Sequence, residues 1–232
     1  MTGIEYFVFN SFQERCGIVW DKDGFCAFTD PGAASDAEIA SLTGFVASKK
    51  LKPVCILLTH AHFDHIYGVA ALMKEYRIPV YMHERERFTL QQANPLLCKA
   101  FGLPLPADFM QSPTSCADGG SSVRYVSQGS IVPVGSLRFE VLETPGHTAG
   151  GVCYLERTEK TLFSGDTLFA GAIGRTDQPG GDYDALMKGI FEQLMILDGD
   201  IAVYPGHGPE TDIATERMTN PFLMPFNEPY EE

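Results

Sequence analysis

Histidine and aspartate are concentrated in one short stretch of this chain, Thr59–His65, which reads Thr-His-Ala-His-Phe-Asp-His. The stretch contains three of the six histidines in the sequence. Neutral imidazole nitrogen and carboxylate oxygen suit zinc and similar ions, so the run predicts a metal site. His60 and His62 share one face of an extended segment, whereas Asp64 and His65 must point in different directions. The four side chains are therefore better divided between two neighbouring ions than gathered around one.

Four side chains cannot complete two coordination spheres, so the fold must bring further ligands from distant segments. Three candidates follow strand-like apolar runs, namely His147, Asp166 and His207. Gly146 and Gly206 stand immediately before the two histidines, and a glycine turn at a strand end holds a side chain rigidly at a sheet rim. Taken singly, each candidate is as readily an ordinary loop or turn residue. Together with the first cluster, they favour a metal site built from four separate segments.

In this order, the residues resemble the metallo-β-lactamase superfamily, and more closely its glyoxalase II-like (hydroxyacylglutathione hydrolase-like) thioester hydrolases. The resemblance extends from Asp30 to Leu223. It implies an α/β fold, a four-layer αββα sandwich with the metals at one rim of the sheets. It also implies two ligand sets joined by a bridging Asp166: His60, His62 and His147 for one ion, and Asp64, His65 and His207 for the other.

A binuclear site of this kind predicts hydrolysis. Two zinc ions, with iron or manganese as alternatives, share a water and lower its pKa to roughly 7. The resulting bridging hydroxide would attack a carbonyl polarised by one metal, while the other stabilises a departing thiolate. Asp64 is the candidate that orients the nucleophile or takes up its proton. The predicted activity is zinc-dependent hydrolysis of a small-molecule thioester, without a Ser-His-Asp or Cys-His nucleophile.

Two residues outside the ligand set are further candidates. Asp30 is followed by Pro31 and Gly32, and these three residue types are common in turns, so Asp30 can be explained as a turn residue alone. The resemblance suggests instead that its carboxylate orients a ligand histidine. Arg175 is a candidate bidentate donor to a substrate carboxylate. A salt bridge from Arg175 to Asp177 or Asp182 that shapes the loop is an equally good interpretation. The remaining histidine, His83, is predicted to have no metal role.

Other functions compete with the hydrolase. Persulfide dioxygenases of the same superfamily resemble the chain around Gly174–Asp177 and would use one iron on His60, His147 and Asp166. A true β-lactamase is disfavoured because it would normally be exported and the subclasses compared lack a bridging aspartate. A diiron redox scaffold is disfavoured because an acidic residue would be expected in place of His62. The non-enzyme alternative is a metal-stabilised binding protein, which would not need the complete ligand set.

Composition restricts the setting of this chemistry. The chain of 232 residues is 44% hydrophobic, enough for a sizeable core in one domain spanning residues 1–232. A net charge of −13 argues against a nucleic-acid partner. Six cysteines without a C-x-x-C pair, no membrane-length apolar run and no signal-like start predict reduced thiols and a cytoplasmic protein. The oligomeric state stays open.

Periodicity predicts two β-rich halves, each followed by helices. The predicted helices cover Ser35–Ser48, a segment from Val69 to Tyr76, and Tyr183–Leu197. The predicted strands are Glu5–Phe9, Gly17–Trp20, Phe25–Phe28, Val54–Leu58, Val80–Met82, Val123–Val126, Ile131–Val134, Leu137–Leu142, Val152–Leu155, Thr161–Phe163 and Ile201–Tyr204.

A long segment at about 84–122 interrupts this pattern. Its start is predicted to be helical, and its Phe, Leu and Pro content suits either a cover over the active-site pocket or an oligomer interface. The helical glutathione-binding domain of long glyoxalase II enzymes is not expected after His207. We therefore expect recognition of the thiol portion to be reduced or different.

Overall fold

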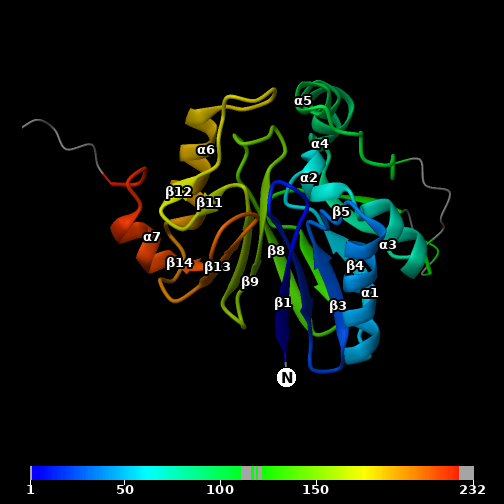
Figure 1. Cartoon of the computed structure of the whole chain (residues 1–232). Coiled ribbons are helices and arrows are strands. Elements are labelled where there is room, and N and C mark those ends of the chain that lie inside the picture. Colours follow the sequence, from blue (N-terminus) through cyan, green and yellow to red (C-terminus); the bar gives the residue numbers. More distant parts are fainter. Residues whose placement is uncertain (1, 111–115, 118, 120–121, 225–232) are drawn as a thin grey trace, which may run out of the picture.

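The computed structural model describes residues 2–110, 116–117, 119 and 122–224. Two six-stranded sheets face each other, and helices cover the outer face of each sheet (Figure 1). The predicted four-layer αββα sandwich is therefore confirmed.

The first sheet has the strand order β1-β2-β3-β4-β5-β6. The first three strands pair antiparallel and the last four pair parallel. Its strands are β1 (Gly3–Phe9), β2 (Glu14–Trp20), β3 (Phe25–Thr29), β4 (Lys52–Leu57), β5 (Val80–His83) and β6 (Val123–Val126). A hairpin joins β2 and β3, with Gly24 at φ 82° in its turn.

Helices α1 (Asp36–Lys49), α2 (Phe63–Ile66) and α3 (Val69–Tyr76) accompany this sheet. The N-cap of α1 is Ser35. Its hydroxyl accepts from the Glu38 amide while the Glu38 carboxylate accepts from the Ser35 amide. This reciprocal pair satisfies two of the amides that the first turn of a helix leaves free. Leu42 and Val46 then turn inward against the sheet.

The second sheet has the order β14-β13-β10-β9-β8-β7. Its strands are β7 (Ile131–Val134), β8 (Leu137–Glu143), β9 (Val152–Glu156), β10 (Thr161–Gly165), β13 (Ala202–Pro205) and β14 (Thr211–Asp212), beside a separate ribbon of β11 (Leu168–Phe169) and β12 (Ala172–Ile173). Helices α6 (Tyr183–Gly189) and α7 (Ile213–Thr219) lie on the outer face. The helix predicted to Leu197 differs in detail, because it is α-helical only to Gly189 and continues as the π-helix η2 (Ile190–Leu194).

Three hydrophobic clusters separate the layers. One packs α1 and α3 on the first sheet, one fills the space between the sheets, and one packs α6, η2 and α7 on the second sheet. Despite the change to π-helical bonding, Leu186, Ile190 and Leu194 are all fully buried in the third cluster. All six cysteines are buried. Among the described residues, no helix is both long and apolar enough to cross a membrane.

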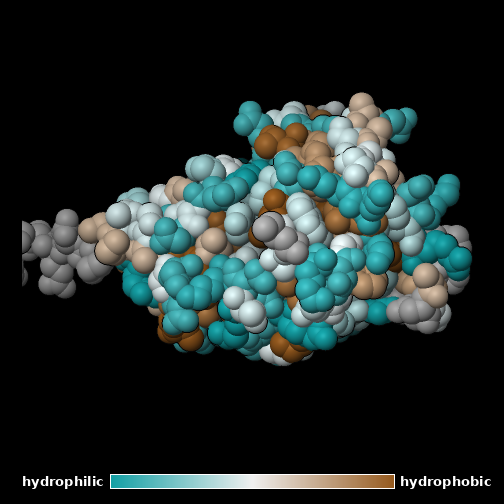
Figure 2. Space-filling view, turned by 90° about the horizontal axis from the view of Figure 1, so that it is seen from below, coloured by the Kyte–Doolittle hydropathy of each residue, from teal (hydrophilic) through white to brown (hydrophobic). Residues whose placement is uncertain are grey.

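One rim of the sandwich receives the ends of several strands that run in the same direction. β3 and β4 are parallel in the first sheet, β10 and β13 are parallel in the second, and β8 shares their direction because β9 is antiparallel to both β8 and β10. The loops that follow these strands therefore meet at one rim, uppermost in Figure 1. The opposite end, seen in Figure 2, is largely hydrophilic with scattered apolar side chains.

The segment at about 84–122 begins with helices, as predicted, and these helices lie above this rim. These are α4 (Glu86–Phe88), the π-helix η1 (Thr89–Ala93) and α5 (Asn94–Phe101). Residues 111–115, 118 and 120–121 of the segment lie outside the described residues. Tyr67 of the rim donates a hydrogen bond to the Pro104 carbonyl at 3.0 Å, which fastens the chain after α5 to the sandwich.

Candidate metal centre

The predicted ligands all lie in the loops of this rim. The loop after β4 contains His60 and His62 and runs into α2, which contains Asp64 and His65. The remaining three, His147, Asp166 and His207, follow β8, β10 and β13. Residues separated by as many as 147 positions are thereby brought together by the sheet topology, as the sequence analysis expected.

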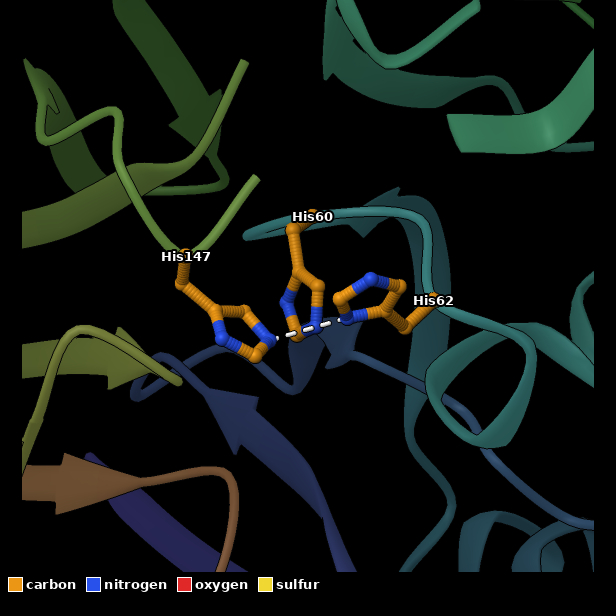
Figure 3. A group of neighbouring side chains, drawn as sticks. All are labelled: His60, His62 and His147. Carbon is orange, nitrogen blue, oxygen red and sulfur yellow. Dashed lines mark hydrogen bonds between the residues drawn. The ribbon is translucent and has the colours of Figure 1, made fainter. Parts of the chain in front are cut away.

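His60, His62 and His147 form the first group. One ring nitrogen from each lies within 4.8 Å of the others, and all three residues are buried. Figure 3 shows the three rings converging, with His62 Nδ1 2.9 Å from His147 Nε2. The ring centroids of His60 lie 4.9 Å from those of His62 and 4.8 Å from those of His147.

Asp64, His65 and His207 form the second group. His207 Nε2 lies 3.2 Å from His65 Nε2 and 3.5 Å from Asp64 Oδ2. The two groups are adjacent, since the rings of His60 and His65 are 4.1 Å apart between centroids. The rim therefore holds two neighbouring sets of three converging donors.

Asp166 lies between the two sets. Its Oδ2 is 3.5 Å from His147 Nε2 in the first group and 3.6 Å from His207 Nε2 in the second. Its Oδ1 is 3.5 Å from His65 Nε2. A single carboxylate thus faces both groups, which is the arrangement required of a bridging ligand.

The donors fit divalent metal ions. Two nitrogens bound to one tetrahedral zinc at about 2.05 Å lie roughly 3.3 Å apart, and the paired rings in each group approach this spacing. His60 Nε2 and Asp166 Oδ1 are buried, yet neither makes a hydrogen bond to another described residue. Buried polar atoms without partners are costly, and a cation would satisfy both.

Gly206 keeps this space open. A Cβ atom at position 206 would lie 2.5 Å from Asp166 Oδ1 and 2.6 Å from His65 Cε1. Both distances are shorter than real Cβ contacts, so a side chain here would displace the two residues. The glycine that the sequence analysis assigned to a strand-end turn is thus also required by the close approach of the cluster.

In four of the five histidines, all except His62, the second ring nitrogen lies near an oxygen of the protein. His147 Nδ1 lies 2.8 Å from the Arg175 carbonyl, and His207 Nδ1 lies 3.0 Å from the Phe12 carbonyl. Such contacts fix the ring orientation and select the tautomer that leaves the other nitrogen free. The rings are therefore oriented before any ion arrives.

Asp30 contacts the His65 ring directly and reaches the His60 ring through Thr59. Its Oδ2 lies 3.4 Å from His65 Nδ1 and accepts the Thr59 hydroxyl at 2.5 Å, while Oδ1 accepts the Thr59 amide at 2.7 Å. The Thr59 hydroxyl in turn lies 3.2 Å from His60 Nδ1. Asp30 is buried and adopts a left-handed φ of 43°, so it belongs to a tight turn and contacts a candidate ligand as well. Both interpretations of Asp30 therefore apply.

Charge is divided unequally between the two groups. Burial, and then the neighbouring imidazoles, hold the pKa of His60 and His62 well below the usual value, so these rings stay neutral. Burial alone would lower the pKa of His65, but the Asp166 and Asp64 carboxylates raise it well above the usual value. His207 is likewise raised against burial, mainly by its hydrogen bond to Asp64. The second group thus has an electrostatic field that favours cations.

Glu86 supports the site and was missed by the sequence analysis. It is fully buried, and its Oε2 accepts the Ala61 amide between His60 and His62 at 2.7 Å. Its Oε1 accepts the Thr148 hydroxyl at 2.6 Å and the Gly150 amide at 2.9 Å. A single carboxylate therefore joins the two loops of the first group.

Asn94 also holds this loop, because its side-chain amide donates a hydrogen bond to the Ala61 carbonyl at 2.9 Å. Both Glu86 and Asn94 belong to the segment at about 84–122. No local pattern marks either residue, because their partners lie at least 25 positions away along the chain. The beginning of this segment thus supports the histidine loop directly.

A pocket of about 430 Å³ opens onto the donors. It is lined by Phe12, His62, Phe63, Asp64, Phe101, His147, Asp166, Phe169, Ala172, Ile173, Arg175, Gln178 and His207. Phe101 comes from the end of α5, so the segment at about 84–122 contributes a residue to the pocket lining.

Arg175 lines the pocket and also forms the predicted salt bridge. Its Nε and Nη2 donate to the two carboxylate oxygens of Asp177 at 2.7 and 2.8 Å. Asp182, the other predicted partner, instead caps α6 by accepting the Ala185 amide at 3.0 Å. The last histidine, His83, lies outside the cluster, with Nε2 3.2 Å from Glu143 Oε1.

The fold and this donor set define the class of the protein. The family described as the metallo-beta-lactamase superfamily matches residues 11–207, and the chain belongs to it. The resemblance found in the sequence is therefore confirmed. The fold of this superfamily implies that divalent metal is bound, consistent with the clusters of histidine and aspartate at the rim.

Individual relatives cover nearly the whole chain. It is 34% identical over 222 residues to "Hydroxyacylglutathione hydrolase GloC" of Haemophilus influenzae, covering 95% of this chain and 97% of that protein. The crystal structure of BLEG-1, described as a B3 metallo-beta-lactamase, superimposes with a TM-score of 0.83 at 34% identity, covering 96% of this chain and all of that one. A di-iron-bound form of TTHA1623 superimposes with a TM-score of 0.77 at 34% identity, covering 94% and 100%.

Proposed function

We propose that this protein is a binuclear metal-dependent hydrolase of small-molecule thioesters. The observation that carries the proposal is the position of Asp166, whose carboxylate faces both groups of three converging donors. A site for one ion needs only three or four ligands, and seven surround this centre. The similarity to a hydroxyacylglutathione hydrolase over nearly the whole chain supports the choice of substrate class.

In this proposal the ligands are divided as the two groups of the rim. His60, His62 and His147 hold one ion, Asp64, His65 and His207 hold the other, and Asp166 bridges them. Zinc is the proposed metal because neutral imidazole and carboxylate donors suit it. The same donors also accept iron, as the di-iron form of TTHA1623 illustrates for a related chain.

Ions bound in such a site polarise a carbonyl oxygen and lower the pKa of a water molecule to about 7. The residues of the chain have separate tasks. Asp64 lines the pocket, and the imidazoles of His65 and His207 hold its pKa below the usual value despite burial. It therefore stays ionised at neutral pH and is available to orient the attacking water.

The reaction consumes one water and needs no other reactant. The water oxygen forms a bond to the acyl carbon, and the bond from that carbon to sulfur breaks. The sulfur leaves with the bonding pair and receives a proton, so the products are a carboxylic acid and a thiol. The rings are held by the Arg175 and Phe12 carbonyls and by Asp30, which keeps the donors in place throughout.

Metal content and activity together test the proposal. Protein purified without added metal should contain two transition-metal ions per chain and hydrolyse a panel of acyl thioesters. A ratio near one with iron dominant, together with oxygen consumption on a persulfide and no thioester cleavage, would favour a mononuclear dioxygenase instead. Two tightly held ions without turnover of any thioester or ester would favour the metal-stabilised binding protein.

A further inference from the structure

The pocket beside the candidate metal centre has an unusual balance of apolar and charged groups. Apart from the proposed ligands, six of its lining residues are apolar: Phe12, Phe63, Phe101, Phe169, Ala172 and Ile173. Among the described lining residues outside the ligand set, Arg175 is the one charged residue, and it is paired with Asp177 through two hydrogen bonds. A substrate in this pocket meets aromatic rings and little free charge.

The aromatic rings form a continuous wall. The ring of Phe12 packs edge-on against Phe63 and Phe101, with centroids 5.1 and 5.5 Å apart. Phe63 and Phe101 are 6.0 Å apart. These distances are typical of stable aromatic pairs, so the three rings hold one another in position.

This wall lies on the side of the second ligand group. Phe63 stands between His62 and Asp64 in the chain, and the Phe12 carbonyl contacts His207. Phe169 also packs on this group, with its ring 6.3 Å from that of His207. An apolar group bound against these rings would therefore sit next to the Asp64, His65 and His207 donors.

Phe101 is the member of the wall that solvent reaches most. It is 49% exposed although it contacts both other rings, and Gly102 ends its helix directly afterwards in a left-handed conformation. A large aromatic side chain left half in water at the edge of a pocket gains free energy when an apolar ligand covers it.

Resting on the proposed hydrolase function, we propose that the substrate is a thioester with an aromatic or similarly large apolar group beside the scissile carbonyl, bound against Phe12, Phe63 and Phe101. A charged tripeptide such as glutathione would find only the paired Arg175 in this lining. The apolar group belongs to either the acyl or the thiol portion of the substrate. One experiment distinguishes these two cases by testing an aromatic group in each portion.

The experiment compares four thioesters with the metal-loaded protein: acetyl and phenylacetyl esters of mercaptoethanol, the acetyl ester of benzyl mercaptan, and S-acetylglutathione. One of the two aromatic substrates should show at least about a tenfold lower KM than acetyl mercaptoethanol. Phe101→Ala should remove most of this advantage, and Phe101→Leu should restore part of it.

Leu96→Ala is the matched control, because Leu96 lies on the same helix, is 60% exposed and is not among the lining residues. It should leave all four KM values unchanged. Equal KM values for the aromatic and acetyl substrates, or preference for the glutathione thioester in both wild type and Phe101→Ala, would overturn the inference.

A binding measurement distinguishes failure of the proposed hydrolase function from failure of the proposed aromatic binding site. If no thioester is cleaved, calorimetry with the ketone analogue of the phenylacetyl ester, in which methylene replaces sulfur, still reports on the wall. Binding that weakens about tenfold in Phe101→Ala, but not in Leu96→Ala, would support the aromatic wall as a binding site. No binding to any of the three proteins would refute it.

Discussion

The role of Glu86 gives the sharpest test of how the candidate metal centre is supported. Replacing Glu86 with glutamine keeps the size of the side chain but leaves one acceptor oxygen in place of two. If that oxygen still accepts hydrogen bonds from the Thr148 hydroxyl and the Gly150 amide, the new NH₂ group takes the place of the oxygen that now accepts from the Ala61 amide at 2.7 Å. Two donors then face each other. At least one buried donor then loses its partner.

The expected size of the effect follows from these contacts. A buried donor left without a partner costs about 1–3 kcal/mol, so Glu86→Gln should lower the free energy of unfolding by about 2 kcal/mol. Glu86→Ala removes all three acceptor contacts and opens a cavity, so the loss should be about 3–6 kcal/mol. The burial that raises the pKa of Glu86 offsets part of either loss, because the variants no longer bury a carboxylate.

Urea unfolding of metal-free protein measures the stability, and competition with a chelator measures the metal affinity of the folded protein. Glu86→Gln should weaken metal binding about 10- to 100-fold, because the loops of His60 and His147 share its contacts. Glu84→Gln is the control: Glu84 is exposed two positions earlier and should change the stability by less than about 0.5 kcal/mol. If Glu86→Gln behaves like Glu84→Gln in both measurements, the supporting role assigned to Glu86 is wrong.

Two further predictions concern other carboxylates. Asp21 is buried and accepts two hydrogen bonds from Ser136 and one each from the Asp23 and Phe25 amides. These hydrogen bonds outweigh burial and lower its pKa, so Asp21→Asn should lower the free energy of unfolding by about 2 kcal/mol at pH 7. A carboxylate whose pKa is lowered by folding stabilises the fold fully only above its pKa in the unfolded chain, about 3.9 for aspartate. The difference in unfolding free energy between wild type and Asp21→Asn, measured by urea titration, should therefore shrink as the pH falls below that value. A difference that stays constant with pH would contradict the reasoning. Asp166→Asn should reduce thioester turnover more than about 100-fold and lower metal content, whereas His83→Ala should retain both. Equal losses in these two folded variants would show that the ligand assignment is wrong.

The sequence by itself indicated most of the helices and strands and all seven candidate ligands. Val54–Leu58 and Val69–Tyr76 have local periodicities that persist in the fold as β4 and α3. Ser35 caps α1 because its partner, Glu38, is only three residues away. The cluster at Thr59–His65 was visible for the same reason, since its four donors are neighbours in the chain.

Other parts of the site depend on distances that no local pattern contains. Asp177 rather than Asp182 pairs with Arg175 because Asp182 is occupied in capping α6. Glu86 reaches both the Ala61 and Thr148 loops only after the segment at about 84–122 folds over the rim.

The position of Asp166 between the two donor groups and the aromatic wall around Phe101 were likewise decided by the tertiary structure. Strand direction could place the predicted ligands at one rim, because parallel strand ends share an edge. Their spacing to within a few tenths of an ångström requires the packing of both sheets and of the segment above them. The residue types therefore indicated the chemistry, while the packing of the whole chain determined the geometry of the site and the shape of the pocket.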